Sequence, residues 1–273
     1  MLSSAARRRE SAAMEIVIQP DAAAVAVFGA DIIERLIAGS PHAVLGLATG
    51  SSPLALYDEL VRRCNDAGLS FAEATAFLLD EYIGLPVGHP ASYRVFIQQH
   101  FTGLIDIDPR NVHVPEGAAD DIALACNRYE AQIRGAGGID LQLLGIGADG
   151  HLGFNEPTSS LASRTRVKTL TAQTRRDNAR FFDNVGEVPS HVVTQGIGTI
   201  LDARHLLLIA VGAAKAEAIA KAVEGPVSSM CPASAMQLHP HVTVVVDEAA
   251  AARLTLADYY RDTFAGKPPW QSS

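Results

Sequence analysis

The feature that most constrains the fold is an alternation between short apolar runs and longer amphipathic stretches. The apolar runs are bounded by turn residues and have strand length, whereas the stretches between them show helical periodicity. Strands are expected at residues 15–18, 43–48, 75–79, 112–114, 140–145, 205–211 and 242–246. Helices are expected at 22–38, 53–67, 92–102, 121–134, 172–182, 214–223 and from 249 onward.

This alternation predicts an α/β fold, with an open, mostly parallel sheet flanked by helices on both faces in a modified Rossmann-like arrangement. No Pro/Gly/Ser-rich linker or internal repeat divides the chain, so residues 14–273 are expected to form a single domain. Residues 1–13 are small, polar and basic. We expect them to be a mobile tail, or the result of a start codon placed upstream of Met14.

Composition and charge exclude several classes of function. The 273 residues carry a net charge of −8, which gives no global attraction to nucleic acid or to a membrane surface. No apolar run is long enough to span a bilayer, and residues 1–13 lack the apolar core of a secretory signal. The three cysteines form no CxxC pair, which favours reduced thiols and a cytoplasmic protein.

In an open α/β sheet, ligands bind at the carboxyl ends of the strands, so the residues that follow each apolar run are the candidates. The first such junction is Thr49-Gly50-Ser51-Ser52, followed by Pro53 at the expected start of a helix. Hydroxyls and free N–H groups at a helix N-terminus favour a phosphate. The alternative is a serine that only caps the helix.

The second junction places Asp80 and Glu81 directly after an apolar run. Adjacent residues of an extended chain point in opposite directions, so only one of the two can face a cleft. A partly desolvated carboxylate there would have a raised pKa suited to a general base. The alternative is a solvated turn with an acid that caps a helix.

The third junction, residues 145–157, combines Asp149, His151 and Glu156 with several glycines. A carboxylate beside an imidazole fixes its tautomer, which is typical of a histidine that shuttles protons. A metal site and a structural turn are the alternatives, although no HExxH-like spacing is present. Glycines 145, 147 and 150 also match GxGxxG, but Gly153 and Pro157 break the helix that a dinucleotide site requires.

Together the segments ATGSSP, LLDEYIGLP, SYRVFIQQHF, GIGADGHLGFNEP, SRTRVKT and ARFF resemble glucosamine-6-phosphate deaminases, from about Met14 to the C-terminal helix. The resemblance implies conversion of glucosamine 6-phosphate and water to fructose 6-phosphate and ammonia, with no cofactor and no metal. It implies that Asp80 transfers a proton between C2 and C1. It also implies that His151, with Asp149 and Glu156, opens the sugar ring.

The same resemblance assigns the substrate-phosphate site to residues 49–52, Arg180 and Lys215. By pattern alone, Arg180 and Lys215 would be solvated helix charges. The family also implies a homo-oligomer, a hexamer in some members, in which N-acetylglucosamine 6-phosphate binds between subunits as an activator. The residues predicted for that second phosphate are Arg166, Lys168 and Thr169.

In a strand, Arg164 would share one face with Arg166 and Lys168, although such a basic face is often only solvated.

Two other functions remain as alternatives. A 6-phosphogluconolactonase-type hydrolase shares this fold, but Tyr82 and FNEP stand where that family has other residues. A non-catalytic sugar-phosphate sensor would need a DNA-binding segment before the domain, and residues 1–13 are too short for one.

Overall fold

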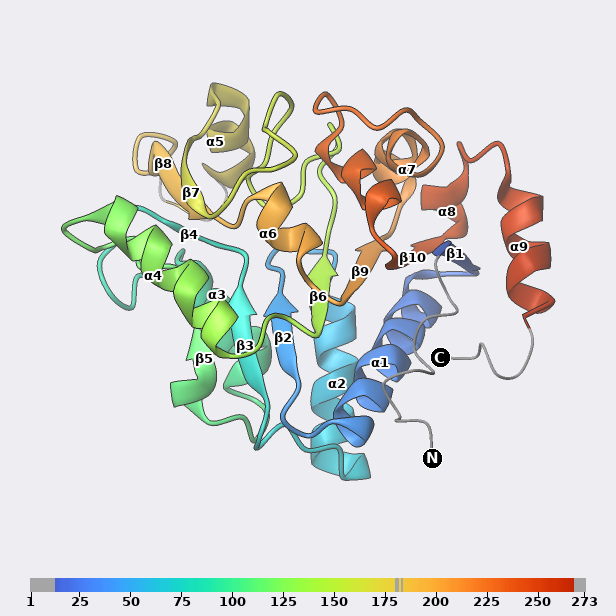
Figure 1. Cartoon of the computed structure of the whole chain (residues 1–273), viewed down its shortest axis with the longest axis horizontal. Helices are drawn as coiled ribbons and strands as arrows, with labels where there is room; N and C mark the ends of the chain where they lie inside the picture. Colours follow the sequence, from blue (N-terminus) through green and yellow to red (C-terminus); the bar gives the residue numbers. More distant parts are fainter. Residues whose placement is uncertain (1–12, 180–181, 183, 268–273) are drawn as a thin grey trace.

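Seven strands form one parallel sheet in the computed structural model, which describes residues 13–179, 182 and 184–267 (Figure 1). The strand order is β1-β10-β9-β6-β2-β3-β5, and every neighbouring pair is parallel. The bounds are β1 Ala13–Gln19, β2 Val44–Leu47, β3 Thr75–Leu78, β5 Val112–His113, β6 Leu141–Leu144, β9 His205–Ala210 and β10 His241–Asp247. These are the seven predicted strands, and the predicted fold class is confirmed.

The strand β1 begins at Ala13, one residue inside the segment expected to be a tail. The other twelve residues of that segment lie outside the described part of the chain. β1 pairs with β10 along its whole length.

Helices cover both faces of this sheet, and α4 and α6 lie in front of it in Figure 1. The helices are α1 Ala22–Gly39, α2 Leu54–Ala67, α3 Tyr93–Ile97, α4 Ile122–Gly135, α5 Ala172–Asn178, α6 Ile197–Leu201, α7 Ala216–Val223, α8 Glu248–Ala251 and α9 Ala257–Ala265. A π-helical turn, Gln98–Thr102, continues α3. Aspartate side chains cap the N-termini of α1 and α4: Asp21 and Asp121 accept hydrogen bonds from backbone N–H groups in the first turns of these helices.

Several helix predictions need correction. The helix expected over 172–182 ends at Asn178, and the stretch from 249 onward is two helices, α8 and α9, rather than one. The helix α2 begins at Leu54, with Pro53 as the capping residue outside it. The short helix α6 was not predicted at all, because five residues give too little periodicity.

A second, antiparallel sheet was also not predicted. It has the order β4-β8-β7, with β4 Asp80–Tyr82, β8 His191–Thr194 and β7 Arg166–Thr169. Only Leu79 separates β3 from β4, so the chain leaves the parallel sheet and enters the antiparallel one at this point. The first residue of β4, Asp80, pairs with Thr194. The small sheet therefore covers the carboxyl end of β3.

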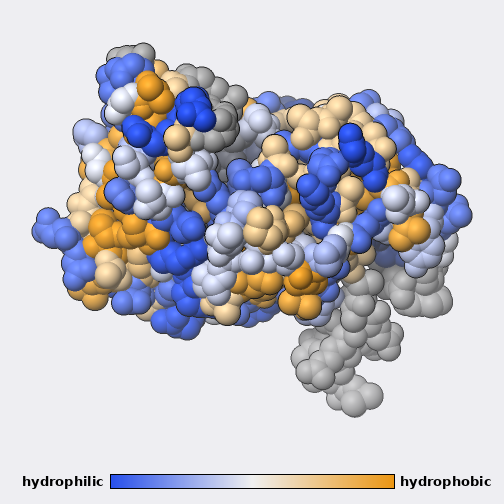
Figure 2. Space-filling view, turned by 90° about the horizontal axis from the view of Figure 1, so that it is seen from above, coloured by the Kyte–Doolittle hydropathy of each residue, from blue (hydrophilic) through white to orange (hydrophobic). Residues whose placement is uncertain are grey.

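The described surface and helices agree with the expectation from composition. No helix of the described residues is long and apolar enough to cross a membrane. Hydrophilic and hydrophobic residues are intermixed on the face seen from above in Figure 2. The three cysteines are free thiols, two of them buried.

Candidate active site

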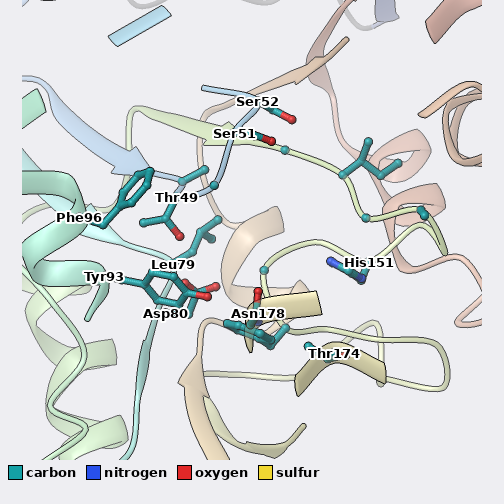
Figure 3. A pocket seen from close by; sticks show the side chains of 18 of the residues that line it. Thr49, Ser51, Ser52, Leu79, Asp80, Tyr93, Phe96, His151, Thr174 and Asn178 are labelled. Carbon is teal, nitrogen blue, oxygen red and sulfur yellow. The ribbon is translucent and has the colours of Figure 1, made fainter. Parts of the chain in front are cut away.

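The carboxyl ends of β2, β3 and β6 border a cavity of about 370 Å³ (Figure 3). This is where the strand order reverses, since the chain runs outward from β2 to β5 and then returns to β6 on the other side. The cavity brings together most of the predicted site residues: Thr49, Gly50, Ser51, Ser52, Asp80, His151 and Lys215. Asp149 and Glu156 stand behind this lining, and Arg180 lies outside the described residues.

The loop between β2 and α2 presents three hydroxyl groups to the cavity, those of Thr49, Ser51 and Ser52. Gly50 takes φ +100°, a backbone conformation that favours glycine. No side chain caps α2, so in the described structure the serine is not used as an ordinary N-cap. Hydroxyls and the N-terminus of a helix are groups that favour an anion, so this loop is the candidate anion site.

Lys215 adds the positive charge of this anion site. It stands at the start of α7, and its Nζ donates to the carbonyl oxygen of Ile146 at 2.7 Å. Burial lowers the pKa of Lys215, while Asp149 opposes that shift. One ammonium proton is used by Ile146, which leaves the others available to a ligand in the cavity.

Asp80 is the buried carboxylic acid of the site. The residue is 4% exposed and lines the cavity, and its carboxyl group receives no hydrogen bond from any described residue. Burial, and to a lesser extent the neighbouring Glu81 carboxylate, raise the pKa of Asp80 to about 8. A carboxyl group in this state can both take up and release a proton near neutral pH.

Glu81 points the other way, as expected for adjacent residues of a strand. Its carboxylate accepts the backbone N–H groups of Tyr82, Tyr93 and Arg94 at 2.8, 3.0 and 3.0 Å. It therefore holds the N-terminus of α3. Of the two acids, Asp80 faces the cavity and Glu81 supports the helix beside it.

His151 and Asp149 form a pair on the loop after β6. Nδ1 of His151 lies 2.6 Å from Oδ1 of Asp149, whose pKa is lowered by that contact. The opposite ring nitrogen, Nε2, is the one left for the cavity. Gly147 makes this possible, because a Cβ atom there would stand 2.1–2.4 Å from atoms of the imidazole ring.

Glu156 is held by Thr174, whose hydroxyl donates to Oε1. Thr174 itself lines the cavity. The third member of the predicted relay is thus one side chain removed from the cavity in this structure. Its link to the site runs through the first turn of α5.

Sequence reasoning missed four cavity residues: Tyr93 and Phe96 of α3, and Thr174 and Asn178 of α5 (Figure 3). Tyr93 stacks on Tyr82 with ring centroids 4.9 Å apart. Neither helix follows a strand of the parallel sheet, since α3 comes after a loop and α5 after the antiparallel strand β7, so the rule of strand ends did not point to them. The spacing of Thr174 and Asn178, one turn apart, was the available signal.

The structure also bears on the dinucleotide and metal alternatives for this segment. The chain after Gly145 continues as turns and an irregular loop, so GxGxxG does not begin a helix and no dinucleotide fingerprint is formed. Within residues 13–179, 182 and 184–267, no group of three or more His, Cys, Asp and Glu side chains is arranged to hold a metal ion.

The three cations expected on one face of a strand are not equivalent. Arg164 precedes β7 and binds two acids, Glu130 and Asp202, each with an N···O distance of 2.6 Å. Arg166 and Lys168 do share one face of β7, both half-buried. The expectation of three aligned cations is therefore wrong for Arg164, since a buried carboxylate recruits it.

Comparison with known proteins identifies the family. The family model of glucosamine-6-phosphate isomerases/6-phosphogluconolactonase matches residues 20–245. A glucosamine-6-phosphate deaminase of Arthrobacter sp. (strain FB24) is 62% identical over 258 residues, which is 94% of this chain and 99% of that protein. One of Mycolicibacterium smegmatis is 59% identical over 259 residues, 94% of this chain and 99% of that protein.

Comparison with solved structures supports the same family. A monomeric glucosamine-6-phosphate deaminase superposes with a TM-score of 0.85 and 43% identity, covering 88% of this chain and all of that one. A 6-phosphogluconolactonase of Thermotoga maritima shares the fold at 20% identity, with a TM-score of 0.67 over 86% of this chain and all of that one. The chain belongs to the glucosamine-6-phosphate isomerase/6-phosphogluconolactonase family, and within it to the glucosamine-6-phosphate deaminases.

Proposed function

We propose that the cavity binds glucosamine 6-phosphate in this chain and converts it, with water, to fructose 6-phosphate and ammonia. The observation that supports this most directly is the meeting of three parts in one cavity. These parts are an anion-binding loop, a His–Asp pair, and a buried acid that no described residue hydrogen-bonds. The reaction needs one part each for anchoring the phosphate, opening the ring and moving the C2 proton.

The phosphate would be held by residues 49–52 and Lys215. Charge-assisted bonds from the ammonium group, together with hydroxyl and N–H donors, hold a phosphate strongly. This anchor fixes the far end of the sugar, so the anomeric end is directed toward Asp80 and His151. Arg180, which the family resemblance adds to this site, lies outside the described residues.

Ring opening is assigned to His151. Nε2 accepts the proton of the anomeric hydroxyl and returns it to the ring oxygen, which gives the open-chain aldehyde. Asp149 holds Nδ1, so the tautomer and the ring orientation are fixed during both transfers. Glu156 would stabilise the relay through Thr174.

Asp80 then acts on the open chain. Its carboxylate removes the proton from C2, the aldehyde oxygen O1 takes up a proton from the substrate's ammonium group as the enolamine forms, and Asp80 then returns its proton to C1. The amino carbon is now an iminium, to which water adds, and ammonia leaves as the C2 ketone forms. The raised pKa of Asp80, about 8, matches a group that must accept and release the same proton.

Ammonia release from glucosamine 6-phosphate, measured with fructose 6-phosphate formation, tests this function. Lys215→Ala should raise KM for the phosphorylated sugar by about tenfold or more, because a charge-assisted contact is lost. It should leave the much poorer reaction of unphosphorylated glucosamine unchanged. Equal losses for both sugars would place Lys215 away from the phosphate.

The two alternatives give different results in the same assays. A 6-phosphogluconolactonase would hydrolyse the lactone and release no ammonia, and a sensor would bind the sugar phosphate without turnover. The presence of both the Asp80 acid and the His151–Asp149 pair in one cavity favours the deaminase. Free thiols at all three cysteines are compatible with the proposed cytoplasmic location.

Allosteric activation and oligomer formation remain predictions. Arg166 and Lys168 lie on one face of β7 with no acidic partner among the described residues, and Thr169 ends the strand. Such a face suits a second phosphate. Sigmoidal initial rates that become hyperbolic with N-acetylglucosamine 6-phosphate, and lose this response in Lys168→Ala, would support it. The solved relative described as monomeric shows that a deaminase of this fold need not assemble.

A further inference from the structure

Two buried carboxamides connect the Asp80 strand to the His151 loop. Gln195 follows β8, and Asn155 belongs to the loop that carries His151; both side chains are 0% exposed and neither lines the cavity. They touch no bound group in the proposed reaction. Their amide nitrogens, however, donate to backbone carbonyls of Leu78, Leu152 and Gln195, which belong to the segments that carry or pair with the proposed catalytic residues.

Gln195 holds the backbone immediately before Asp80. Its backbone N–H donates to the oxygen of Leu79 at 2.8 Å, and its side-chain Nε2 donates to the oxygen of Leu78 at 3.1 Å. The hydroxyl of Tyr129 donates to the same Leu78 oxygen at 2.7 Å. The two residues that set the direction of the Asp80 side chain are thus fixed from two sides.

Asn155 ties this strand end to the His151 loop. Its Nδ2 donates to the oxygen of Gln195 at 2.7 Å and to the oxygen of Leu152, next to His151, at 2.9 Å. The loop also closes on the acid directly, since a Cβ atom on Gly153 would lie 3.2 Å from Oδ2 of Asp80. One short chain of bonds therefore sets the distance between the two acid/base units.

The same amides are poor choices for stability alone. Oδ1 of Asn155 and Oε1 of Gln195 are both buried and accept no hydrogen bond within the described residues. An unpaired buried acceptor is unfavourable, and an apolar side chain of the same size would avoid it. What the amides provide in return is the placement of carbonyls beside Asp80 and His151.

We propose that Gln195 and Asn155 are positioning residues that hold the base Asp80 in register with the His151 relay. This inference rests on the proposed function, because it assigns these residues a part in the same reaction. Loss of the side-chain hydrogen bonds of Gln195 or Asn155 should not prevent substrate binding, since the residues proposed to bind phosphate belong to other elements. Binding should persist while proton transfer slows.

The test is Gln195→Met, which keeps the volume and the backbone bond to Leu79 but removes the Nε2 donor. Gln142→Met is the matched control. Gln142 is also 0% exposed and has an unpaired Oε1, but its Nε2 donates only to Leu143 within β6. Titration with an open-chain aminoalditol phosphate, which has no carbonyl group and cannot react, gives the affinity and the fraction of competent sites.

In Gln195→Met, kcat per competent site should fall about tenfold or more, while the affinity for the alditol phosphate changes less than about threefold. The deuterium isotope effect with C2-deuterated substrate should be at least as large as in the wild type. Gln142→Met should match the wild type in kcat per competent site, in affinity for the alditol phosphate and in the isotope effect. Turnover per site within about twofold of wild type in Gln195→Met would overturn the proposal, as would an equal loss in Gln142→Met.

If Gln195→Met fails to fold, Asn155→Leu tests the proposal instead. It should show the same lower kcat per competent site, with nearly unchanged affinity and an isotope effect at least as large as in the wild type. Failure of both variants to fold would show that the amides serve the fold and not the base, which also overturns the proposal. A wild-type chain that binds the alditol phosphate but releases no ammonia would instead overturn the proposed function. The two failures are therefore distinguishable.

Discussion

Asp80 combines full burial with the absence of a hydrogen-bond donor from any described residue, and both follow from where it stands in the chain. It is the first residue of β4, separated from the end of β3 only by Leu79, and its backbone pairs with Thr194 of β8 in the antiparallel sheet. The small sheet removes water from the acid, and the cavity gives it access to a ligand. A solvated turn at the same sequence position would let a ligand reach the acid but would not exclude water from it.

Asp80→Asn should lower kcat by about 10²–10⁴-fold, because an amide cannot accept the C2 proton. Affinity for the unreactive alditol phosphate should stay close to that of the wild type, since the phosphate anchor lies on other segments. Steady-state ammonia release and the titration measure the two quantities. Turnover near the wild-type value would remove Asp80 from the mechanism.

Gly147→Ala should reproduce the defect of His151→Gln without changing any titratable group. The added Cβ would stand 2.1–2.4 Å from the imidazole atoms, so the ring must move away from Asp149. Both variants should lose about 10²–10⁴-fold in kcat/KM with the cyclic substrate. Gly135→Ala is the control, since a Cβ there meets nothing within 4 Å. Full activity in Gly147→Ala would show that the ring position is not critical.

The chain's elements show where sequence reasoning succeeds and where it stops. Most strands of the main sheet were predictable because they are buried apolar runs; β2 and β6 are buried at all four positions. The strands β4 and β7 carry acids and cations, and both pair with β8; the pairing of β4 with β8 joins segments more than a hundred residues apart. No local pattern encodes such a pairing, so Asp80 could be recognised as a strand-end acid but its cover could not be foreseen.

Arg164 illustrates the same limit at the level of side chains. In a strand it would share one face with Arg166 and Lys168, yet β7 begins only at Arg166 and the Arg164 side chain pairs with Glu130 of α4. Glu130 also accepts from Thr165 and Thr199. Burial pushes the pKa of Glu130 upward, but the hydrogen bonds from both threonines outweigh it and the pKa is lowered. Glu130 therefore anchors the chain just before β7 to α4.

Glu130→Gln should therefore lower the free energy of unfolding by about 2–4 kcal/mol, because one amide cannot satisfy the same donors. Denaturant unfolding at pH 7 measures this. Since Glu130 stands outside the cavity lining, kcat of the folded variant should change little. A large loss of kcat with unchanged stability would mean that the anchor controls the site itself.

Across the whole molecule, burial shifts the pKa values of titratable groups at the two ends of the parallel sheet in opposite directions. The carboxyl end holds Asp80, with Glu81, Tyr82, Tyr93 and Tyr129 as its titratable neighbours, and its pKa is raised. The amino end holds His205 and His241, whose rings stack with centroids 3.7 Å apart. His239, Lys267 and Glu15 surround that pair. Burial lowers the pKa of His205 to about 3 and also lowers that of His241.

The sign of each effect follows from proton linkage. The folded state keeps the Asp80 proton that the unfolded chain releases, so this group's stabilisation is present below pH 4 and is lost as the pH rises to about 8. The folded state excludes the proton that unfolded His205 takes up. Its stabilisation is therefore present above about pH 6.5 and is lost as the pH falls toward 3.

Asp80→Asn and His205→Phe should consequently change the melting temperature in opposite pH ranges. Relative to the wild type, Asp80→Asn should gain stability steadily from pH 4 to pH 8, because the amide has no charge to desolvate. His205→Phe keeps the ring stacked on His241 but loses the contact of Nε2 with Thr243, 2.9 Å long, so it should be less stable at pH 8. That deficit should shrink as the pH falls from 6.5 to 4, since Phe takes up no proton. Melting curves in buffers of constant ionic strength measure both differences, and two parallel offsets at every pH would mean that neither buried group has the shifted pKa.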